Sequence, residues 1–217
     1  MTFMKLVIGN KNYSSWSLRP WIFMRICQIP FEEILVPLDT DETAAKLAPF
    51  FSGNKVPVLL DGDRTVWDSL AILEYLSETY LAGKGWPADT DKRAFARSIS
   101  AEMHSGFPAL RTQLPMNCRR MIEGFRIPPE AQKDIDRIRA IWEKYRNIYK
   151  GDGDWLFGEF SIADAMFTPV VLRFNTYYVP LPGMIGVYAR NVLARPELGE
   201  WLDAAKQETE VIKQAEV

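Results

Sequence analysis

The stretch from Asn54 to Tyr75 constrains the fold most strongly, because it places three short elements in immediate succession. Asp61-Gly62 separates two short apolar runs, and Gly accepts the positive φ that a tight hairpin turn requires. Asp68 and Ser69 then precede apolar residues at helical spacing, so these side chains can accept hydrogen bonds from the first amide groups of a helix. The sequence therefore predicts a hairpin of two strands followed directly by an amphipathic helix.

The strand that enters this hairpin has an edge suited to an extended ligand. Pro57 lacks an N–H group and usually lies at a strand start or a sheet edge. Val56 beside it can therefore keep its own N–H and C=O groups for a peptide-like partner. Since the predicted helix N-terminus follows closely, the two features form half of a binding site.

The composition excludes several classes of protein. The chain has 217 residues, 47% of them hydrophobic and 25% charged, which is enough for one large or two modest cores. A net charge of −2 argues against a nucleic-acid partner. One His and two distant cysteines, Cys27 and Cys118, do not match the common zinc patterns, so we expect no metal. No run approaches the ~20 apolar residues of a membrane span, so we expect no membrane association. The two widely separated cysteines favour a location in the reducing cytoplasm.

Strand and helix signals alternate over residues 1–81 and predict an α/β domain. Lys5 to Ile8 is compatible with a buried strand. A helix follows, with Ser17 as its expected N-cap and Pro20 in its first turn. Phe31 to Val36 is a second strand. A βαβ unit thus precedes the hairpin and its helix.

The second part of the chain has a different pattern. Gly and Pro accumulate after Ala82, and beyond that segment strand signals nearly vanish. We predict a linker over residues 82–90 and an all-helical domain over residues 91–217. Its expected helices are Asp91 to about Leu114, Asp134 to Tyr149, one opened by the capping-box sequence Ser161-Ile162-Ala163-Asp164, and Pro196 to Ala205.

This order of motifs resembles the cytosolic glutathione transferases over essentially the whole chain. The resemblance is carried by Lys55-Val56-Pro57-Val58-Leu59, by Asp68-Ser69 at the start of a helix, and by the capping box in the second domain. It implies a thioredoxin-like α/β N-terminal domain that binds glutathione, a cis bond before Pro57, and an all-α helical-bundle C-terminal domain that contributes the electrophile pocket. It also implies a cytoplasmic homodimer that acts in detoxification, with glutathione as the co-substrate.

The subclass is indicated by Tyr13-Ser14-Ser15-Trp16-Ser17-Leu18-Arg19. This segment resembles the serine-type transferases and lies nearest to the zeta-like bacterial members, whose motif is Ser-Ser-Cys-x-x-Arg. By position Ser14 matches the serine that contacts the glutathione sulfur, and Ser15 is its helper. Trp16 stands where the zeta class has Cys, and that departure weakens the expectation of zeta-type maleylacetoacetate isomerisation.

A hydroxyl at this place has a chemical purpose. A thiol with a pKa of ~8.5 is only a few per cent thiolate at neutral pH. A hydrogen bond from a serine hydroxyl, aided by the positive end of a helix, favours the anion without moving a proton to the protein. The thiolate then attacks a small electrophile. The alternative is that Ser14 and Ser15 only supply loop polarity, while Ser17 is purely structural.

The rest of the glutathione site follows from the shape of the tripeptide. Asp68 suits the ammonium group, while Ser69 and the amides after it suit the γ-glutamyl carboxylate. Val56, beside Pro57, should pair its backbone with the cysteinyl residue, and Lys55 can reach the glycyl carboxylate. Ordinary helix capping is the alternative for Asp68 and Ser69, and a solvated surface position is the alternative for Lys55.

The electrophile pocket is expected between the thiolate and the first helices of the second domain. Its candidate residues are Trp16, Met103, His104, Phe107 and Arg111. They mix soft apolar surface with a few polar groups, which suits an apolar substrate with a polar or anionic handle. His104 is a candidate general acid, although a lone His on a helix is more often a packing residue.

Three functions remain open on this basis. The first is a serine-type glutathione transferase, with or without glutathione-dependent isomerase activity. The second is a non-catalytic binding or assembly protein with the glutathione-transferase fold. The third is a thiol-disulfide oxidoreductase, which needs a cysteine at the start of the first helix; neither Cys27 nor Cys118 lies there. Ser14 and the Asp68-Ser69 pair are both present in the sequence, and their presence favours the first function.

Overall fold

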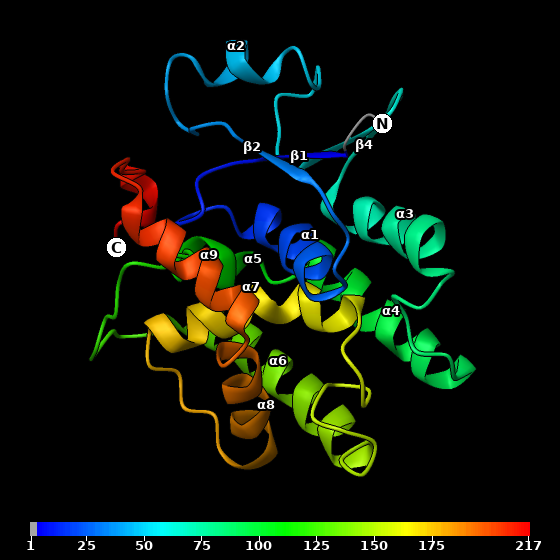
Figure 1. Cartoon of the computed structure of the whole chain (residues 1–217). Helices are drawn as coiled ribbons and strands as arrows, with labels where there is room; N and C mark the ends of the chain where they lie inside the picture. The colour runs from blue at the N-terminus through cyan, green and yellow to red at the C-terminus, as the bar shows by residue number, and fades with distance from the viewer. Residues whose placement is uncertain (1–3) are drawn as a thin grey trace.

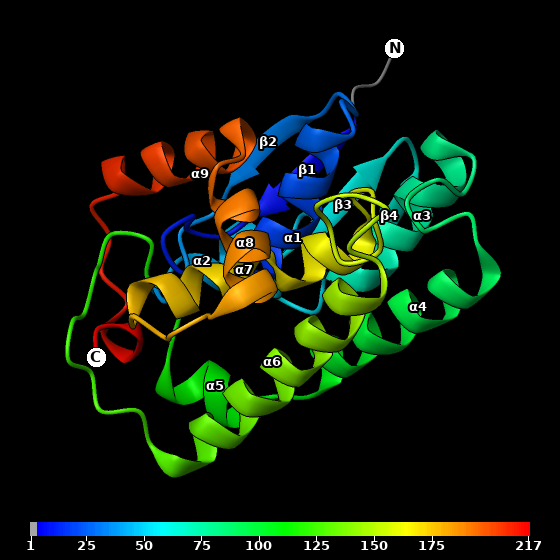
Figure 2. The ribbon, with the colours of Figure 1, turned by 90° about the horizontal axis from the view of Figure 1, so that it is seen from below.

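The computed structural model describes residues 4–217, which fold into a small sheet with helices on both faces and a larger helical region (Figures 1 and 2). The strands are β1 (Lys5–Ile8), β2 (Glu32–Leu35), β3 (Val58–Asp61) and β4 (Arg64–Val66). The helices are α1 (Ser15–Ile26), α2 (Thr43–Leu47), α3 (Ser69–Leu81), α4 (Thr90–Ser105), α5 (Pro108–Gln113), α6 (Pro129–Ile148), α7 (Ile162–Thr176), α8 (Gly183–Leu193), α9 (Pro196–Gln207) and the short 3-10 helix η1 (Lys213–Ala215).

The sheet has the strand order β2-β1-β3-β4. Strand β1 pairs in parallel with β2 and antiparallel with β3, and β3 pairs antiparallel with β4. Successive side chains of a strand point to opposite faces. Val7 accordingly packs with Leu47 of α2, whereas Leu6 and Ile8 join the larger core with Leu18 of α1. Figure 1 shows the result, with α2 on one face of the sheet and α1 and α3 on the other.

The predicted hairpin is confirmed. Asp61 pairs with Arg64 across the turn, and Gly62 has a φ of 58°. That left-handed conformation favours glycine, because a side chain there would be strained. The Asp61 carboxylate accepts hydrogen bonds from the hydroxyls of Tyr75 (2.6 Å) and Tyr80 (2.5 Å), so it ties the hairpin to α3.

The start of α1 differs from the prediction. Ser17 is not the N-cap; Ser14 is, and its Oγ accepts a hydrogen bond from the Ser17 N–H at 3.4 Å. Ser17 lies inside the helix, where its buried hydroxyl oxygen accepts the Gly9 N–H at 3.1 Å. Pro20 consequently lies in the interior of α1 rather than in its first turn.

Helix α7 forms the centre of the helical domain. It contacts α1, α4 and α8, and nearly all of its side chains are buried. The predicted capping box at its start is present, with the Asp164 carboxylate accepting the Ser161 N–H at 2.9 Å. Figure 2 shows α7 (yellow to orange) behind α6 and α8. Trp142 of α6 packs against Phe167 and Phe174 of α7, with ring centroids 5.8 and 5.4 Å away.

Other helices depart from the predicted limits. The helix expected from Asp91 to Leu114 is two helices, α4 and α5, because the chain turns at Gly106 and at Phe107, whose φ is 58°. Helix α6 begins at Pro129, earlier than predicted, and α2 and α8 were not predicted. Helix α3 ends at Leu81 and α4 begins at Thr90, and the placement of the domain boundaries within this interval stays a prediction. Among residues 4–217, no helix has the length and apolarity needed to cross a membrane.

Candidate active site

A cavity of about 440 Å³ opens where the two domains meet. Its walls come from the start of α1, the connection from α2 to β3, the connection from β4 to α3, and α4. It brings together seven of the twelve residues that the sequence analysis assigned to the site. The lining residues are Trp16, Phe51, Gly53, Lys55, Val56, Pro57, Trp67, Asp68, Ser69 and His104.

One wall of the cavity is the predicted strand edge. The Val56–Pro57 peptide bond is cis, as the resemblance implies. Neither the N–H nor the C=O group of Val56 makes a hydrogen bond within residues 4–217. Both groups are therefore available to an extended ligand. Beside them, Phe51 and Trp67 pack together with ring centroids 4.5 Å apart, and the Trp67 side chain is exposed.

The N-terminus of α3 forms the adjoining wall. The Asp68 carboxylate accepts the N–H groups of Leu70 (3.0 Å) and Ala71 (3.3 Å), so Asp68 is the N-cap. The Ser69 hydroxyl is buried, and in the described part of the chain neither it nor the Ser69 N–H has a hydrogen-bond partner. Two orphan donors at the positive end of a helix are a suitable site for a carboxylate.

His104 joins the two domains at this cavity. Its Nε2 lies 2.9 Å from the second carboxylate oxygen of Asp68, so α4 contacts the N-terminus of α3 directly. Its ring packs edge to face on Trp16, with centroids 5.4 Å apart. The predicted role of His104 as a general acid is not needed to explain this position, because the residue already has a structural contact on each side.

The two candidate serines lie at the start of α1 and are almost fully buried. The Ser14 hydroxyl donates to the Ser17 hydroxyl oxygen at 2.7 Å. The Ser15 hydroxyl accepts a hydrogen bond from Arg173 of α7 at 3.2 Å. Neither serine is among the residues that line the cavity, but the next residue, Trp16, is. Their contact with a sulfur atom therefore stays a prediction.

Trp16 lies between two guanidinium groups. The Cζ atoms of Arg19 and Arg111 are 4.2 and 4.5 Å from the Trp16 ring centroid. This arrangement gives favourable cation–π contacts and holds the indole at the cavity wall. Met103 and Phe107, also predicted for the electrophile pocket, are buried in the core and do not line the cavity, and Arg111 lies behind Trp16.

Several residues near the serines were not found by sequence reasoning. The C-terminal segment crosses the loop before α1, where the Glu208 carboxylate accepts the N–H groups of Lys11 (2.6 Å) and Asn12 (3.0 Å). The Tyr13 hydroxyl donates to Glu216 at 2.6 Å and accepts from Arg119 at 2.7 Å. These partners are separated by about a hundred or more positions in the chain, so no local spacing could have indicated them.

Neither cysteine is suited to thiol chemistry at this cavity. Cys27 follows the last residue of α1, and burial raises the pKa of its thiol to about 11. Burial raises the pKa of the Cys118 thiol to about 12. Both thiols are protonated at neutral pH, and only the thiolate is nucleophilic. These positions disfavour the thiol-disulfide oxidoreductase.

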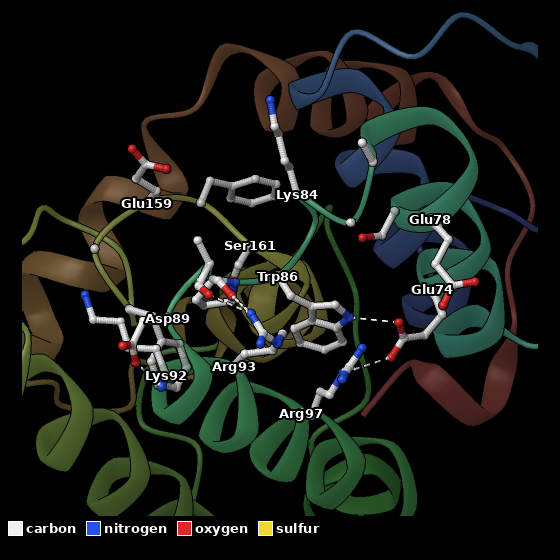
Figure 3. Close-up of a pocket in the computed structure, with 18 of the residues that line it drawn as sticks. Glu74, Glu78, Lys84, Trp86, Asp89, Lys92, Arg93, Arg97, Glu159 and Ser161 are labelled. Atoms are coloured by element: carbon white, nitrogen blue, oxygen red, sulfur yellow. Dashed lines mark hydrogen bonds and ion pairs between the residues drawn. The ribbon is translucent and has the colours of Figure 1, made fainter.

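A larger cavity of about 960 Å³ lies on another side of the molecule, between α3, α4 and the segment before α7 (Figure 3). None of the predicted site residues lines it. Several of its polar groups already have partners: Glu74 accepts from the Trp86 indole at 2.8 Å and pairs with Arg97 at 3.6 Å, while Arg93 donates to backbone oxygens of the interdomain segment. We therefore interpret it as a seam between the domains.

The fold and the smaller cavity together define a class of protein. A four-stranded thioredoxin-like domain supplies a strand edge beside a cis proline and a helix N-terminus with two unpartnered donors, and an all-helical domain closes the cavity. This is the arrangement of a glutathione-binding transferase.

Comparison with known proteins gives the family. Residues 13–79 match the model for the glutathione S-transferase N-terminal domain, and residues 128–204 match that for the C-terminal domain. The chain is 34% identical to the probable maleylacetoacetate isomerase of Caenorhabditis elegans, over 92% of this chain and 99% of that protein. It is 23% identical to glutathione S-transferase L1 of Arabidopsis thaliana, over 85% of this chain and 71% of that protein. The chain belongs to the glutathione S-transferase family.

A solved structure has the same fold. It is a glutathione transferase homologue from Burkholderia gl BGR1 with bound glutathione, which superposes with a TM-score of 0.73. The match covers 95% of this chain and 100% of that one at 22% sequence identity. The predicted thioredoxin-like domain and helical-bundle domain are confirmed.

Proposed function

We propose that this protein binds glutathione in the 440 Å³ cavity and uses its thiolate to attack a small electrophile. The observation that carries the proposal is the unpartnered pair of donors on Ser69 at the N-terminus of α3, in the same cavity as the open backbone of Val56. A peptide with a carboxylate satisfies both features, since the carboxylate accepts from the Ser69 donors and the peptide backbone pairs with Val56. Within residues 4–217, no group of the cavity walls hydrogen-bonds to the Ser69 donors or to the Val56 backbone.

The cavity supports one orientation of glutathione. Its γ-glutamyl carboxylate lies at the Ser69 donors, and its ammonium group lies at the exposed Asp68 carboxylate. The cysteinyl residue pairs with the backbone of Val56, as an added strand would. Lys55 lines the same cavity and faces the glycyl carboxylate. The thiol then lies at the start of α1, where the helix N-terminus favours an anion.

The chemistry is of the serine type. A serine hydroxyl at the start of α1 donates a hydrogen bond to the sulfur, and the thiol proton leaves to solvent. The electrophile lies against Trp16 and His104, with Met103, Phe107 and Arg111 packed behind them. The sulfur attacks an electrophilic carbon of this substrate, giving addition or displacement.

Glutathione-dependent isomerisation is the second candidate. It is supported by the similarity to a probable maleylacetoacetate isomerase that the chain covers almost completely. Trp16 distinguishes this chain from the zeta motif, because its indole fills the place of a small cysteine. We also propose a cytoplasmic homodimer with a detoxifying role, and a division of the chain into residues 1–81, a linker 82–90 and residues 91–217.

Replacing Asp68 with Asn tests the placement of the ammonium group. Asn is as good an N-cap as Asp, so α3 keeps its capping while the charge is lost. We expect glutathione to bind about fivefold more weakly in calorimetric titrations, a modest effect because the Asp68 side chain is 55% exposed. The matched control is Asp63→Asn in the nearby hairpin turn, which removes the same charge outside the cavity. Equal losses in both variants would contradict the placement.

A further inference from the structure

Two buried arginines and one half-buried arginine surround the start of α1, and none of them forms an ion pair within residues 4–217. Arg19 and Arg173 are 2% and 6% exposed, and Arg111 is half-buried. Within residues 4–217, no carboxylate lies within 4.0 Å of any of the three guanidinium groups. Buried charges are normally paired, because desolvation of an unpaired ion is costly. This cluster of positive charge is therefore an unusual feature.

The three guanidinium groups bind backbone oxygens and one hydroxyl instead. Arg19 donates to the carbonyl oxygens of Met166 (3.1 Å) and Ser15 (3.0 Å). Arg173 donates to the Leu114 carbonyl oxygen at 2.7 Å and to the Ser15 hydroxyl at 3.2 Å. Arg111 donates to the carbonyl oxygens of Met103 and His104. Neutral acceptors fix these groups in place but leave their charge uncompensated, so an anion nearby is stabilised.

Burial and, to a smaller extent, neighbouring positive charge lower the pKa values of Arg19 and Arg173. Burial lowers the pKa of Arg173 to about 10, and the charge on Arg111 acts in the same direction. Burial, then the charges on Arg111 and Arg173, also lower the pKa of Arg19. The other titratable groups that act on Arg173 are Tyr177 and Cys118, whose pKa values burial raises to about 12. At neutral pH these two are uncharged. Asp134 is an acidic group that acts on the cluster, where it opposes the lowering of the Arg111 pKa by burial, so the net local charge of the three arginines and Asp134 is positive.

The hydrogen bonds of the two serines distinguish them. A hydroxyl has one proton to donate. Ser14 uses its proton on the Ser17 hydroxyl oxygen at 2.7 Å. Ser15 accepts from Arg173, so its own proton remains available, and it directly precedes the cavity residue Trp16.

We infer that Ser15, rather than Ser14, donates the hydrogen bond to the glutathione thiolate, and that Arg173 is the positioning residue that holds and polarises the Ser15 hydroxyl. The inference rests on the proposed function. Arg173 acts from α7 of the helical domain, so the thiolate site is complete only when both domains are packed together. Arg19 fixes the backbone of the same serine from the other side.

The test is a titration of bound glutathione, following thiolate absorbance against pH in the wild type and in four variants: Ser14→Ala, Ser15→Ala, Arg173→Met and the double variant Ser15→Ala/Arg173→Met. We expect Ser15→Ala and Arg173→Met each to raise the thiol pKa by about one unit, because each removes a hydrogen bond or a nearby opposite charge. The double variant should raise it by less than the sum, since Arg173 acts partly through Ser15. Ser14→Ala should leave the pKa near the wild-type value.

Arg146→Met is the matched control. Arg146 is also buried, at 1% exposure, and donates to the Gly153 and Trp155 carbonyl oxygens far from the cavity. The Arg146→Met variant should lower the free energy of unfolding, as Arg173→Met does, and leave the thiol pKa of bound glutathione unchanged. If Arg173→Met does not fold, Arg173→Lys replaces it and should give a smaller rise, because one ammonium group cannot serve both acceptors in the same way.

The outcomes separate the inference from the proposed function. If Ser14→Ala raises the thiol pKa and Ser15→Ala does not, or if Arg173 variants shift it no more than Arg146→Met, the inference is wrong. If the wild type binds glutathione in a calorimetric titration and lowers its thiol pKa, the proposed function stands in either case. If the wild type does not bind glutathione, the proposed function itself fails.

Discussion

Replacing Asp164 with Ala should lower the free energy of unfolding by about 3 kcal/mol. The Asp164 carboxylate is fully buried and accepts three hydrogen bonds, from the Leu156 N–H (3.1 Å), the Ser161 N–H (2.9 Å) and the Ser161 hydroxyl (3.1 Å). Alanine leaves these buried donors without a partner, and each such donor costs about 1–3 kcal/mol. The loss falls on α7, which contacts helices of both domains.

Urea unfolding followed by circular dichroism measures this effect, and Asp89→Ala is the matched control. Asp89 is the exposed N-cap of α4, and its carboxylate accepts only the Lys92 N–H at 2.9 Å. We expect the control to cost about 1 kcal/mol, as exposed caps do. Equal costs at the two positions would show that the buried network around Asp164 contributes nothing beyond ordinary capping.

The same residue gives a pH dependence. Burial raises the pKa of Asp164 to about 6 in the folded protein, whereas an unfolded Asp has a pKa of ~3.9. Between these values the folded state holds a proton that the unfolded state has lost, so the free energy of unfolding falls as pH rises from about 4 to about 6. Asp164→Ala lacks this contribution. The substitution should therefore cost more at pH 4 than at pH 7.

Replacing Ser69 with Ala should weaken glutathione binding by about ten- to a hundredfold. The Ser69 hydroxyl is buried at the cavity wall and has no partner within residues 4–217. A hydrogen bond from it to a carboxylate contributes about 1.5–3 kcal/mol, since the acceptor is charged and the donor is buried. Because the hydroxyl supports no other contact, the free energy of unfolding should change little.

Calorimetric titration with glutathione measures the affinity, with Ser98→Ala as the control. Ser98 lies on the exposed side of α4, where its hydroxyl donates to the Ala94 carbonyl oxygen at 2.8 Å. The control should bind glutathione as the wild type does. An unchanged affinity in Ser69→Ala would remove the γ-glutamyl carboxylate from the N-terminus of α3 and require a different orientation of the tripeptide.

Local sequence patterns predicted most of the fold. The Asp61-Gly62 hairpin and the Ser161–Asp164 capping box are determined by residues within a few positions of each other, so spacing alone indicated them. Helix α2 has only five residues with one buried side chain, Leu47, which leaves no periodicity to detect. Helix α8 follows Pro182 and contains glycines, which weaken helix propensity.

The site could be predicted only in part, because local patterns do not show which distant elements pack together. Val56 and Ser69 lie on elements that are adjacent in the sequence, and both were named from it. Arg173 reaches Ser15 across a separation of 158 positions, and only the packing of α7 on α1 brings them together. Ser14, Ser15 and Ser17 compete for the N-cap of α1, and the helical spacing of the apolar residues that follow favours Ser17. The structure assigns it to Ser14, since Ser17 is needed by the Gly9 N–H.

The most direct test of the account is the ionisation of glutathione bound to the wild-type protein. The measurement is the ultraviolet thiolate absorbance of the glutathione complex against pH, with the complex of S-methylglutathione, which has no ionisable thiol, as the reference. We predict a thiol pKa at least about one unit below the ~8.5 of an unperturbed cysteine thiol, because a helix N-terminus, a serine hydroxyl and unpaired guanidinium groups all favour the anion. A bound thiol that titrates at its unperturbed value would contradict the account.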